Sequence, residues 1–96
     1  MDNDQFIQQC KKAMKDFVQR SMNPAYRHLR GAGADGLEDK IYVVWSCKTL
    51  QNNKALLALT IEDGMYYECT YNGDKHELYL DAYGKRHNEA IKIEVD

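Results

Sequence analysis

The N-terminal segment carries apolar side chains at three- and four-residue steps. This spacing places them on one stripe of an α-helix and leaves polar residues on the other side. Asp2, Asn3 or Asp4 can cap the start of such a helix, because their side chains accept hydrogen bonds from its first N–H groups. The pattern predicts an amphipathic helix that ends near Met22. Its apolar stripe consists of Phe6, Ile7, Cys10, Ala13, Met14, Phe17 and Val18.

The segment after this helix contains signals for a second, shorter helix followed by a loop. Asn23 is a favourable N-cap, Pro24 suits the first helical position, and Gly31 is a natural stop. We therefore expect a short helix over Pro24–Leu29. Because glycine recurs after it, we expect residues 31–38 to form a flexible loop.

From residue 39 onward the apolar positions follow a period of two, which is typical of strands. In the first run, Ile41, Val43, Trp45 and Cys47 are expected to share one face. Turn residues separate the runs, which favours an antiparallel meander. The expected strands cover residues 41–49, 55–60, 65–71, 76–83 and 91–95. The predicted fold class is α+β, a single domain with a helical part at 1–30 and a sheet at 39–96. The N-terminal amphipathic helix packs on one face of this four- or five-stranded sheet.

The turn between the third and fourth strands decides which side chains lie opposite each other. A two-residue Asn72-Gly73 loop, which pairs Tyr71 with Asp74, would set Glu68 opposite Glu77, and two like charges repel across a strand pair. We therefore expect the register that pairs Asn72 with Lys75. It directs one set of side chains toward the helix: Tyr67, Cys69, Leu78, Leu80 and, from the fifth strand, Ile93.

The opposite side of the sheet is the most informative surface that the pattern predicts. One helix covers one face, so tyrosines and carboxylates on the other face point into solvent. Tyrosine combines apolar area with a polar tip and is enriched at protein interfaces. It is also simply a good strand former, so an ordinary solvent-facing sheet stays an alternative, as does a homodimer that buries this face. The predicted partner-binding residues are Tyr66, Glu68, Glu77, Tyr79, Asp81 and Tyr83.

Length, charge and cysteine content limit the classes of function. Ninety-six residues suit one small domain, and a formal charge of −2 argues against a general phosphate-binding role. No apolar run approaches the ~20 residues of a membrane helix, and no secretory pattern is visible, so we expect no membrane association. Three cysteines without a CxxC pair leave one unpaired in any disulfide scheme, which favours a reducing, intracellular setting.

The charge is unevenly distributed along the chain, which supports an alternative function. Residues 1–30 carry a net charge of +3, and the remaining residues carry −5. A basic helix beside a stackable tyrosine can hold a single nucleic-acid strand, although a lysine-bearing helix face is most often only solvated. The alternative is a small nucleic-acid or nucleotide-binding module. Its residues would be Lys11, Lys12, Lys15, Tyr26 and Arg27.

The sequence predicts no catalytic residues, no metal site and no cofactor. Cysteines and histidines are scattered without the short repeated spacing of metal ligands. The glycine-rich run follows no strand, so it does not match a dinucleotide-binding fingerprint. One enzymatic hypothesis stays open, because Cys69 and His76 lie close across the expected hairpin and could form a thiolate–imidazolium pair.

Three stretches of sequence resemble a known group of proteins. They are VVWSCKTLQNNKALL at residues 43–57, DGMYYE at 63–68 and TYNGDK at 70–75. They are similar to a family of short uncharacterised proteins from phages and prophages of Gram-positive bacteria. The resemblance covers about residues 39–95, and the chain departs from it in segment 23–37. No catalytic residues can be transferred from this family.

The resemblance implies a phage or prophage accessory protein that acts in the host bacterial cytoplasm. Such proteins often work without catalysis, by occupying a surface of a host factor. The expected function is non-enzymatic binding of a host protein with a basic surface, for example a defence nuclease, as an anti-CRISPR inhibitor would bind. An acidic aromatic sheet suits a basic groove by charge and shape.

Overall fold

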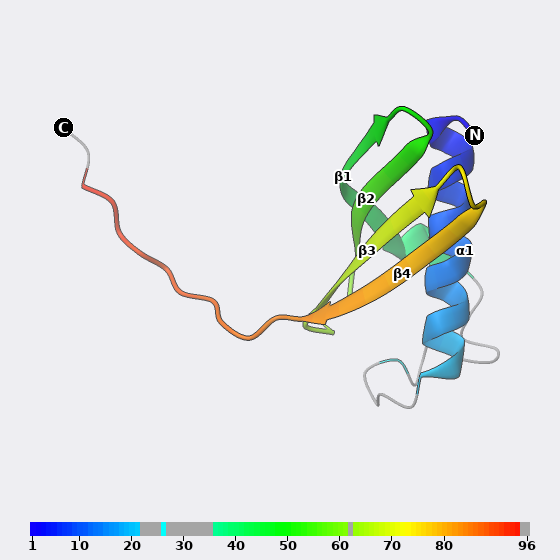
Figure 1. Cartoon of the computed structure of the whole chain (residues 1–96). Helices are drawn as coiled ribbons and strands as arrows, with labels where there is room; N and C mark the ends of the chain where they lie inside the picture. Colours follow the sequence, from blue (N-terminus) through cyan, green and yellow to red (C-terminus); the bar gives the residue numbers. More distant parts are fainter. Residues whose placement is uncertain (22–25, 27–35, 62, 95–96) are drawn as a thin grey trace.

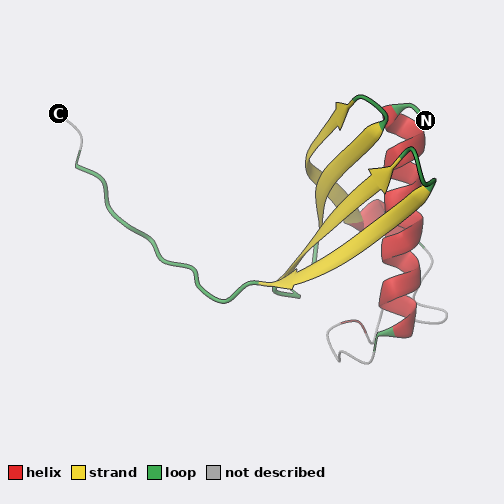
Figure 2. Cartoon of the chain, in the orientation of Figure 1, coloured by secondary structure: helices red, strands yellow, loops and turns green. Residues whose placement is uncertain are grey.

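One helix and one antiparallel sheet make up the described part of the chain (Figures 1 and 2). The structure is a computed structural model that describes residues 1–21, 26, 36–61 and 63–94. Its elements are α1 (Asn3–Arg20), the short 3₁₀ helix η3 (Leu37–Lys40), β1 (Ile41–Thr49), β2 (Asn52–Leu59), β3 (Met65–Asn72) and β4 (Glu77–Gly84). The four strands pair in the order β1-β2-β3-β4. The α+β meander that the sequence predicts is therefore confirmed.

Helix α1 begins where its first polar residues can satisfy free backbone groups. The Asp2 carboxylate accepts a hydrogen bond from the Gln5 N–H at 2.8 Å, and the Gln5 side-chain oxygen accepts one from the Asp2 N–H at 2.9 Å. This reciprocal capping box fixes the helix start. Four residues of its apolar stripe are buried: Phe6, Cys10, Met14 and Val18.

The core lies between α1 and the inner face of the sheet. The helix stripe packs with Leu57 of β2 and with Tyr67 and Cys69 of β3, all of which are fully buried. Tyr26 and Leu37, from the connection between helix and sheet, close the same cluster at 1% exposure each. Leu37 and Glu38 belong to η3, so the last two residues of the expected 31–38 loop are part of a helical turn whose first residue, Leu37, is buried.

Strand β1 contains a β-bulge at Val44, which the sequence pattern did not predict. Val43 pairs with Leu57, whereas Trp45 pairs with Leu56, so β1 has one extra residue between these pairs. Because the extra residue reverses the alternation, the residues after it change sides. The expectation that all four alternate residues of this strand share one face is wrong. The two residues that move to the side opposite α1 are Trp45 and Cys47.

The turn between β3 and β4 is two residues longer than expected. Asn72 pairs with Glu77, so Cys69 lies opposite Leu80 rather than Leu78. The Asn72 side-chain oxygen accepts hydrogen bonds from the N–H groups of Asp74 and Lys75 at 3.0 and 3.2 Å, which stabilises the longer turn. Because the register differs by two residues, each side chain still points to the predicted face.

Charge repulsion does not set this register, although we expected it to do so. The observed pairing places Glu68 directly opposite Asp81. Lys54 of β2 lies on the same face, and its ammonium is 3.4 Å from the Glu68 carboxylate. Strand β2 thus supplies the positive charge that a comparison of β3 with β4 alone leaves out.

Residues 91–94, the described part of the expected fifth strand, do not form a strand. Lys85 still bonds to Gly64 beside the sheet, and residues 86–94 then extend away from the domain without regular structure (Figure 1). Ile93 is 75% exposed and does not pack under α1. The expected helix over Pro24–Leu29 and most of the glycine-rich loop lie outside the described residues, apart from Tyr26.

The two hairpin turns at one end of the sheet lie against each other, and Gly73 is the point of contact. A Cβ atom at Gly73 would lie 2.9 Å from the Gln51 Cβ and even closer to the Gln51 carbonyl oxygen. The Gly73 N–H also donates a hydrogen bond to the Asn52 side-chain oxygen at 3.1 Å. This end of the sheet therefore requires glycine.

Replacing Gly73 with alanine is expected to lower the free energy of unfolding by about 1–3 kcal/mol, because the new methyl group overlaps the Gln51 backbone. Urea unfolding followed by circular dichroism measures the change. Asp74→Ala, at an exposed residue of the same turn, is the matched control. Equal urea midpoints for the two variants would contradict the close approach of the turns.

Two adjacent asparagines are expected to respond oppositely to the same substitution. Asn53 is 2% exposed, and neither polar atom of its side chain has a hydrogen-bond partner among the described residues. Asn53→Leu should therefore raise the free energy of unfolding by about 1 kcal/mol, because it removes an unsatisfied buried amide. Asn52→Leu should lower it by about 1 kcal/mol, because Gly73 loses its acceptor. Urea unfolding tests both, and a loss of stability in Asn53→Leu would contradict this interpretation.

Candidate functional site

The surface of the sheet opposite α1, here called the outer face, carries all six predicted partner-binding residues. Cross-strand pairing sets Tyr66 opposite Tyr83, and Glu68 opposite Asp81. Tyr79 lies opposite Thr70, and Glu77 extends the same row at the end of β4. The meander thus brings together six side chains from two strands: Tyr66, Glu68, Glu77, Tyr79, Asp81 and Tyr83. α1 lies on the other side of the sheet (Figure 2), and among the described residues only the Lys85 side chain reaches over one of the six, Tyr66.

Strands β1 and β2 enlarge the outer face with residues that the sequence interpretation did not include. Tyr42 pairs with Ala58, and Trp45 pairs with Leu56. Tyr42 and Trp45 are 48% and 43% exposed, which is similar to Tyr79 at 42%. Tyr42 alternates with Ile41 and could have been placed from the pattern. Trp45 could not, because its side depends on the bulge.

The charges on the outer face are mainly negative toward β4. Glu77 and Asp81 are exposed and have no ion-pair partner among the described residues, while Glu68 is paired with Lys54. The Tyr79 hydroxyl donates a hydrogen bond to the Glu77 carboxylate. This hydrogen bond to the acid raises the pKa of Tyr79 above its ordinary value. Tyr79 is therefore a neutral donor at physiological pH, held in place by its neighbour.

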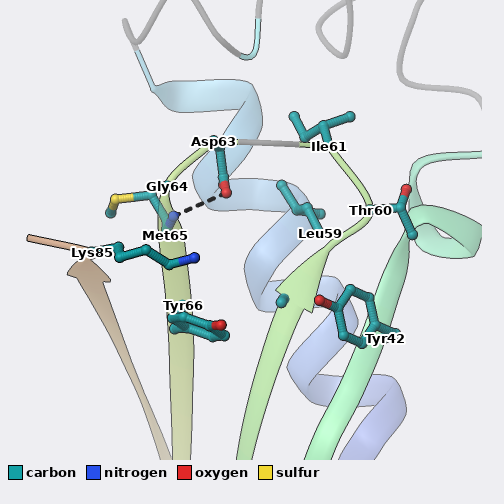
Figure 3. Close-up of a pocket in the computed structure, with 10 residues that line it drawn as sticks. Tyr42, Leu59, Thr60, Ile61, Asp63, Gly64, Met65, Tyr66 and Lys85 are labelled. Atoms are coloured by element: carbon teal, nitrogen blue, oxygen red, sulfur yellow. Dashed lines mark hydrogen bonds between the residues drawn. The ribbon is translucent and has the colours of Figure 1, made fainter. Parts of the chain in front are cut away.

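A pocket of about 680 Å³ opens at one end of the outer face (Figure 3). Tyr42 and Tyr66 lie on its two sides, and Lys85 reaches over Tyr66 with its ammonium 5.7 Å from the ring centroid. The other residues that line it are Ala58, Leu59, Thr60, Ile61, Asp63, Gly64 and Met65. Lys85 is the cation in this lining, so this end of the face is more positive than the centre.

The Asp63 carboxylate beside this pocket is engaged in structural hydrogen bonds. One oxygen accepts from the Met65 N–H at 3.0 Å, and the other accepts from the hydroxyls of Tyr26 and Tyr67 at 2.9 and 2.8 Å. The two tyrosine hydroxyls also contact each other. Burial, together with Asp63, raises the pKa of Tyr26 to about 12, and burial raises the pKa of Tyr67 as well. The Asp63 carboxylate thus holds the buried hydroxyl groups of Tyr26 and Tyr67 in place.

Two of the five residues of the nucleic-acid hypothesis make contacts within the chain. Tyr26 is 1% exposed within the core, so its ring is not available to stack on a base, contrary to expectation. The ammonium of Lys15 lies 3.9 Å from Glu38. Lys11 and Lys12 remain on the helix surface, and Arg27 lies outside the described residues.

The proposed pair of Cys69 and His76 does not form. Cys69 is buried on the inner face, whereas His76 is exposed in the turn, where its Nδ1 lies 3.2 Å from the Tyr71 hydroxyl. The Cys69 side chain instead forms a hydrogen bond with the Cys10 side chain of α1. This hydrogen bond and burial together raise the pKa of the Cys10 thiol. The pair does not form because the longer turn leaves His76 outside the paired residues of β3 and β4.

Further candidate chemistry is sparse in the described part of the chain. Within it, no three His, Cys, Asp or Glu side chains come together as metal ligands would. Searched over the same residues, no helix has the length and apolar character that crossing a membrane requires.

Comparison with known proteins gives one match. The model of a family of unknown function (DUF6275) matches residues 7–93 of the chain. No curated protein and no solved structure matches it.

The buried phenols predict a loss of stability at alkaline pH. The folded pKa of Tyr26, about 12, lies above the ordinary tyrosine value of 10.0, so its contribution is complete below pH 10 and is lost as the pH rises toward 12. The loss should be up to about 1.4 kcal/mol per pH unit for each such group. Tyr26→Phe should lower the free energy of unfolding by about 1 kcal/mol at pH 7 and make the alkaline loss less steep.

Urea unfolding at pH 7, 10 and 11 (roughly the window set by these pKa values) measures both effects. Tyr83→Phe, at an exposed tyrosine, is the control for the titration of other groups. An alkaline loss as steep in Tyr26→Phe as in the control variant would contradict the role of the buried phenol.

Proposed function

We propose that this chain, which belongs to the DUF6275 family of unknown function, binds another protein through the outer face of its sheet and catalyses no reaction. The observation that carries the proposal is the group of exposed aromatic rings among carboxylates on a paired sheet. Tyr79 and Tyr83 are 42% and 52% exposed, and Trp45 is 43% exposed. Within the described residues, nothing in the chain covers them.

Aromatic residues on a sheet are well suited to binding a protein. Tyrosine and tryptophan bring large contact areas and lose little conformational freedom, because they have only two side-chain torsions. Here the strand pairing fixes the backbone below each ring, so the partner need not order this surface. Substitution of such anchor residues in other interfaces typically weakens binding by 2 kcal/mol or more.

The charge of the outer face favours a partner with a basic surface. Glu77 and Asp81 flank Tyr79 along β4 and carry no countercharge among the described residues. A basic groove of the partner would supply it, and opposite potentials speed association and exclude unsuitable partners. The same charges repel a nucleic-acid backbone, so this face favours protein over nucleic acid.

The resemblance of three sequence stretches to short phage and prophage proteins supports a more specific setting. In this proposal the chain acts in the cytoplasm of a host bacterium, and the partner is a host protein. A defence nuclease is the preferred class, because such enzymes have basic grooves for nucleic acid that an acidic aromatic sheet can occupy. The protein would then inhibit by covering that groove, as an anti-CRISPR protein does.

Substitution on the outer face tests the proposal. Proteins captured from a bacterial lysate by the wild-type chain are identified, and each purified candidate is titrated against wild type and against Tyr79→Ala/Tyr83→Ala. We expect the double variant to bind about 30-fold more weakly or worse. Trp45 is the single tryptophan of the chain, so with a partner domain that lacks tryptophan a blue shift of its emission on binding reports burial of the outer face.

The matched control is Gln8→Ala/Lys12→Ala, which removes exposed side chains from the far side of α1. It should bind like wild type, and all three proteins should have the same circular dichroism spectrum. Binding that weakens in the control but not in the tyrosine variant would contradict the proposal and favour the helix as the interface. Retention of labelled single-stranded DNA on a filter at low salt would favour the nucleic-acid alternative.

A further inference from the structure

The chain after β4 carries a strand-like apolar pattern that its own sheet does not use. Ile91 and Ile93 alternate with Lys92 and Glu94, yet the two isoleucines are 69% and 75% exposed. Residues 85–94, here called the tail, run away from the domain in Figure 1. Alternating apolar residues are typical of a strand with one buried face, so the tail is suited to pairing with a sheet.

Strand β4 offers an edge to which such a segment can pair. It lies at one end of the sheet order, so one side of its backbone has no partner strand. Leu78 and Leu80 point toward the core but are only partly buried, whereas Cys69 on the neighbouring strand is fully buried. The core is therefore incompletely covered along β4. The other edge, β1, is less suited, because the bulge at Val44 distorts its ladder.

We propose that the tail of one copy pairs antiparallel with β4 of a second copy, and that the second copy returns the same contact. One register satisfies both the apolar pattern and the charges. With Ile93 opposite Leu80, the isoleucines face the incompletely covered core, and Lys92 lies opposite Asp81. Moving the tail by two residues in one direction would place Glu94 opposite Glu77, a pair of like charges.

The geometry at the start of the tail favours a second copy over the chain's own β4. The Lys85 N–H donates to the Gly64 carbonyl at 2.6 Å, which continues the β3–β4 ladder beyond Gly84. The Lys85 ammonium lies over Tyr66 of β3. The described residues after Lys85 contain no turn that would reverse the chain toward its own edge. Reciprocal exchange is self-complementary, so it closes at two copies. The outer face stays open, so this inference does not rest on the proposed function.

Charge reversal across the predicted contact tests the exchange. Asp81→Lys and Lys92→Asp each place like charges at both symmetric contacts, so each variant alone should dimerise about tenfold more weakly than wild type. Mixing the two variants should restore the dimer as a heterodimer, because each tail then meets an opposite charge on the other copy. Native mass spectrometry distinguishes the heterodimer from both homodimers, and light scattering over a dilution series gives the dissociation constants.

Arg86→Asp is the matched control, because it reverses a charge of the tail outside the paired segment, and it should dimerise like wild type. A wild-type chain that stays monomeric throughout the dilution series would overturn the proposal. Protection of the tail amides from hydrogen exchange in such a monomer would show that the tail folds onto its own β4. A dimer that ignores both charge reversals would also overturn the proposal and place the interface elsewhere, for example on the outer face.

Discussion

The structure depends on the burial of one helix stripe against one face of the sheet. Phe6, Cys10, Met14 and Val18 are fully buried, and they pack with Leu57 and Tyr67 on the inner face. The described part of the chain has one long helix and therefore one such stripe, which covers one face of the four-stranded sheet. The described residues leave the other face open to solvent or to another molecule. The asymmetry that makes the outer face a candidate interface is therefore a direct consequence of how the core is built.

The bulge at Val44 determines how extensive that candidate interface is. Without the extra residue, Trp45 would follow Val43 onto the inner face, where α1 already packs. With it, Trp45 joins Tyr42 on the outer face and extends the aromatic surface from β4 across to β1. Bulges commonly redirect side chains near functional sites. The inserted position thus places Trp45 on the outer face rather than on the inner face, which favours a role for Trp45 in contacts outside the core.

The local pattern of the sequence was sufficient to predict the helix, the four strands and the face to which each residue of β3 and β4 points. These features depend on periodicity, which is present in the sequence itself. The β3–β4 register was not predictable, because it depends on Lys54 of a third strand and on the Asn72 side chain in the turn. The burial of Tyr26 depends on Asp63, 37 residues further along the chain, so its role in the core also escaped the sequence analysis. The prediction of a fifth strand failed for a different reason. The alternating pattern of the tail favours a strand, but it does not specify the sheet edge, or the copy of the chain, with which that strand pairs.

The tail and the outer face become related if two copies exchange tails. Each added strand would lie beside β4, next to the row of Glu77, Tyr79 and Asp81, and would extend the sheet beyond the edge of one copy. Lys92 would partly neutralise the acidic row at Asp81, while Tyr79 and Tyr83 would stay accessible above the sheet. Two outer faces held in one assembly would engage a partner with two basic sites far more strongly than either face alone, because the second contact forms at a high effective concentration. Self-association through the edge and partner binding through the face are therefore compatible on this fold, since Asp81 is the one residue of the outer face that both contacts use.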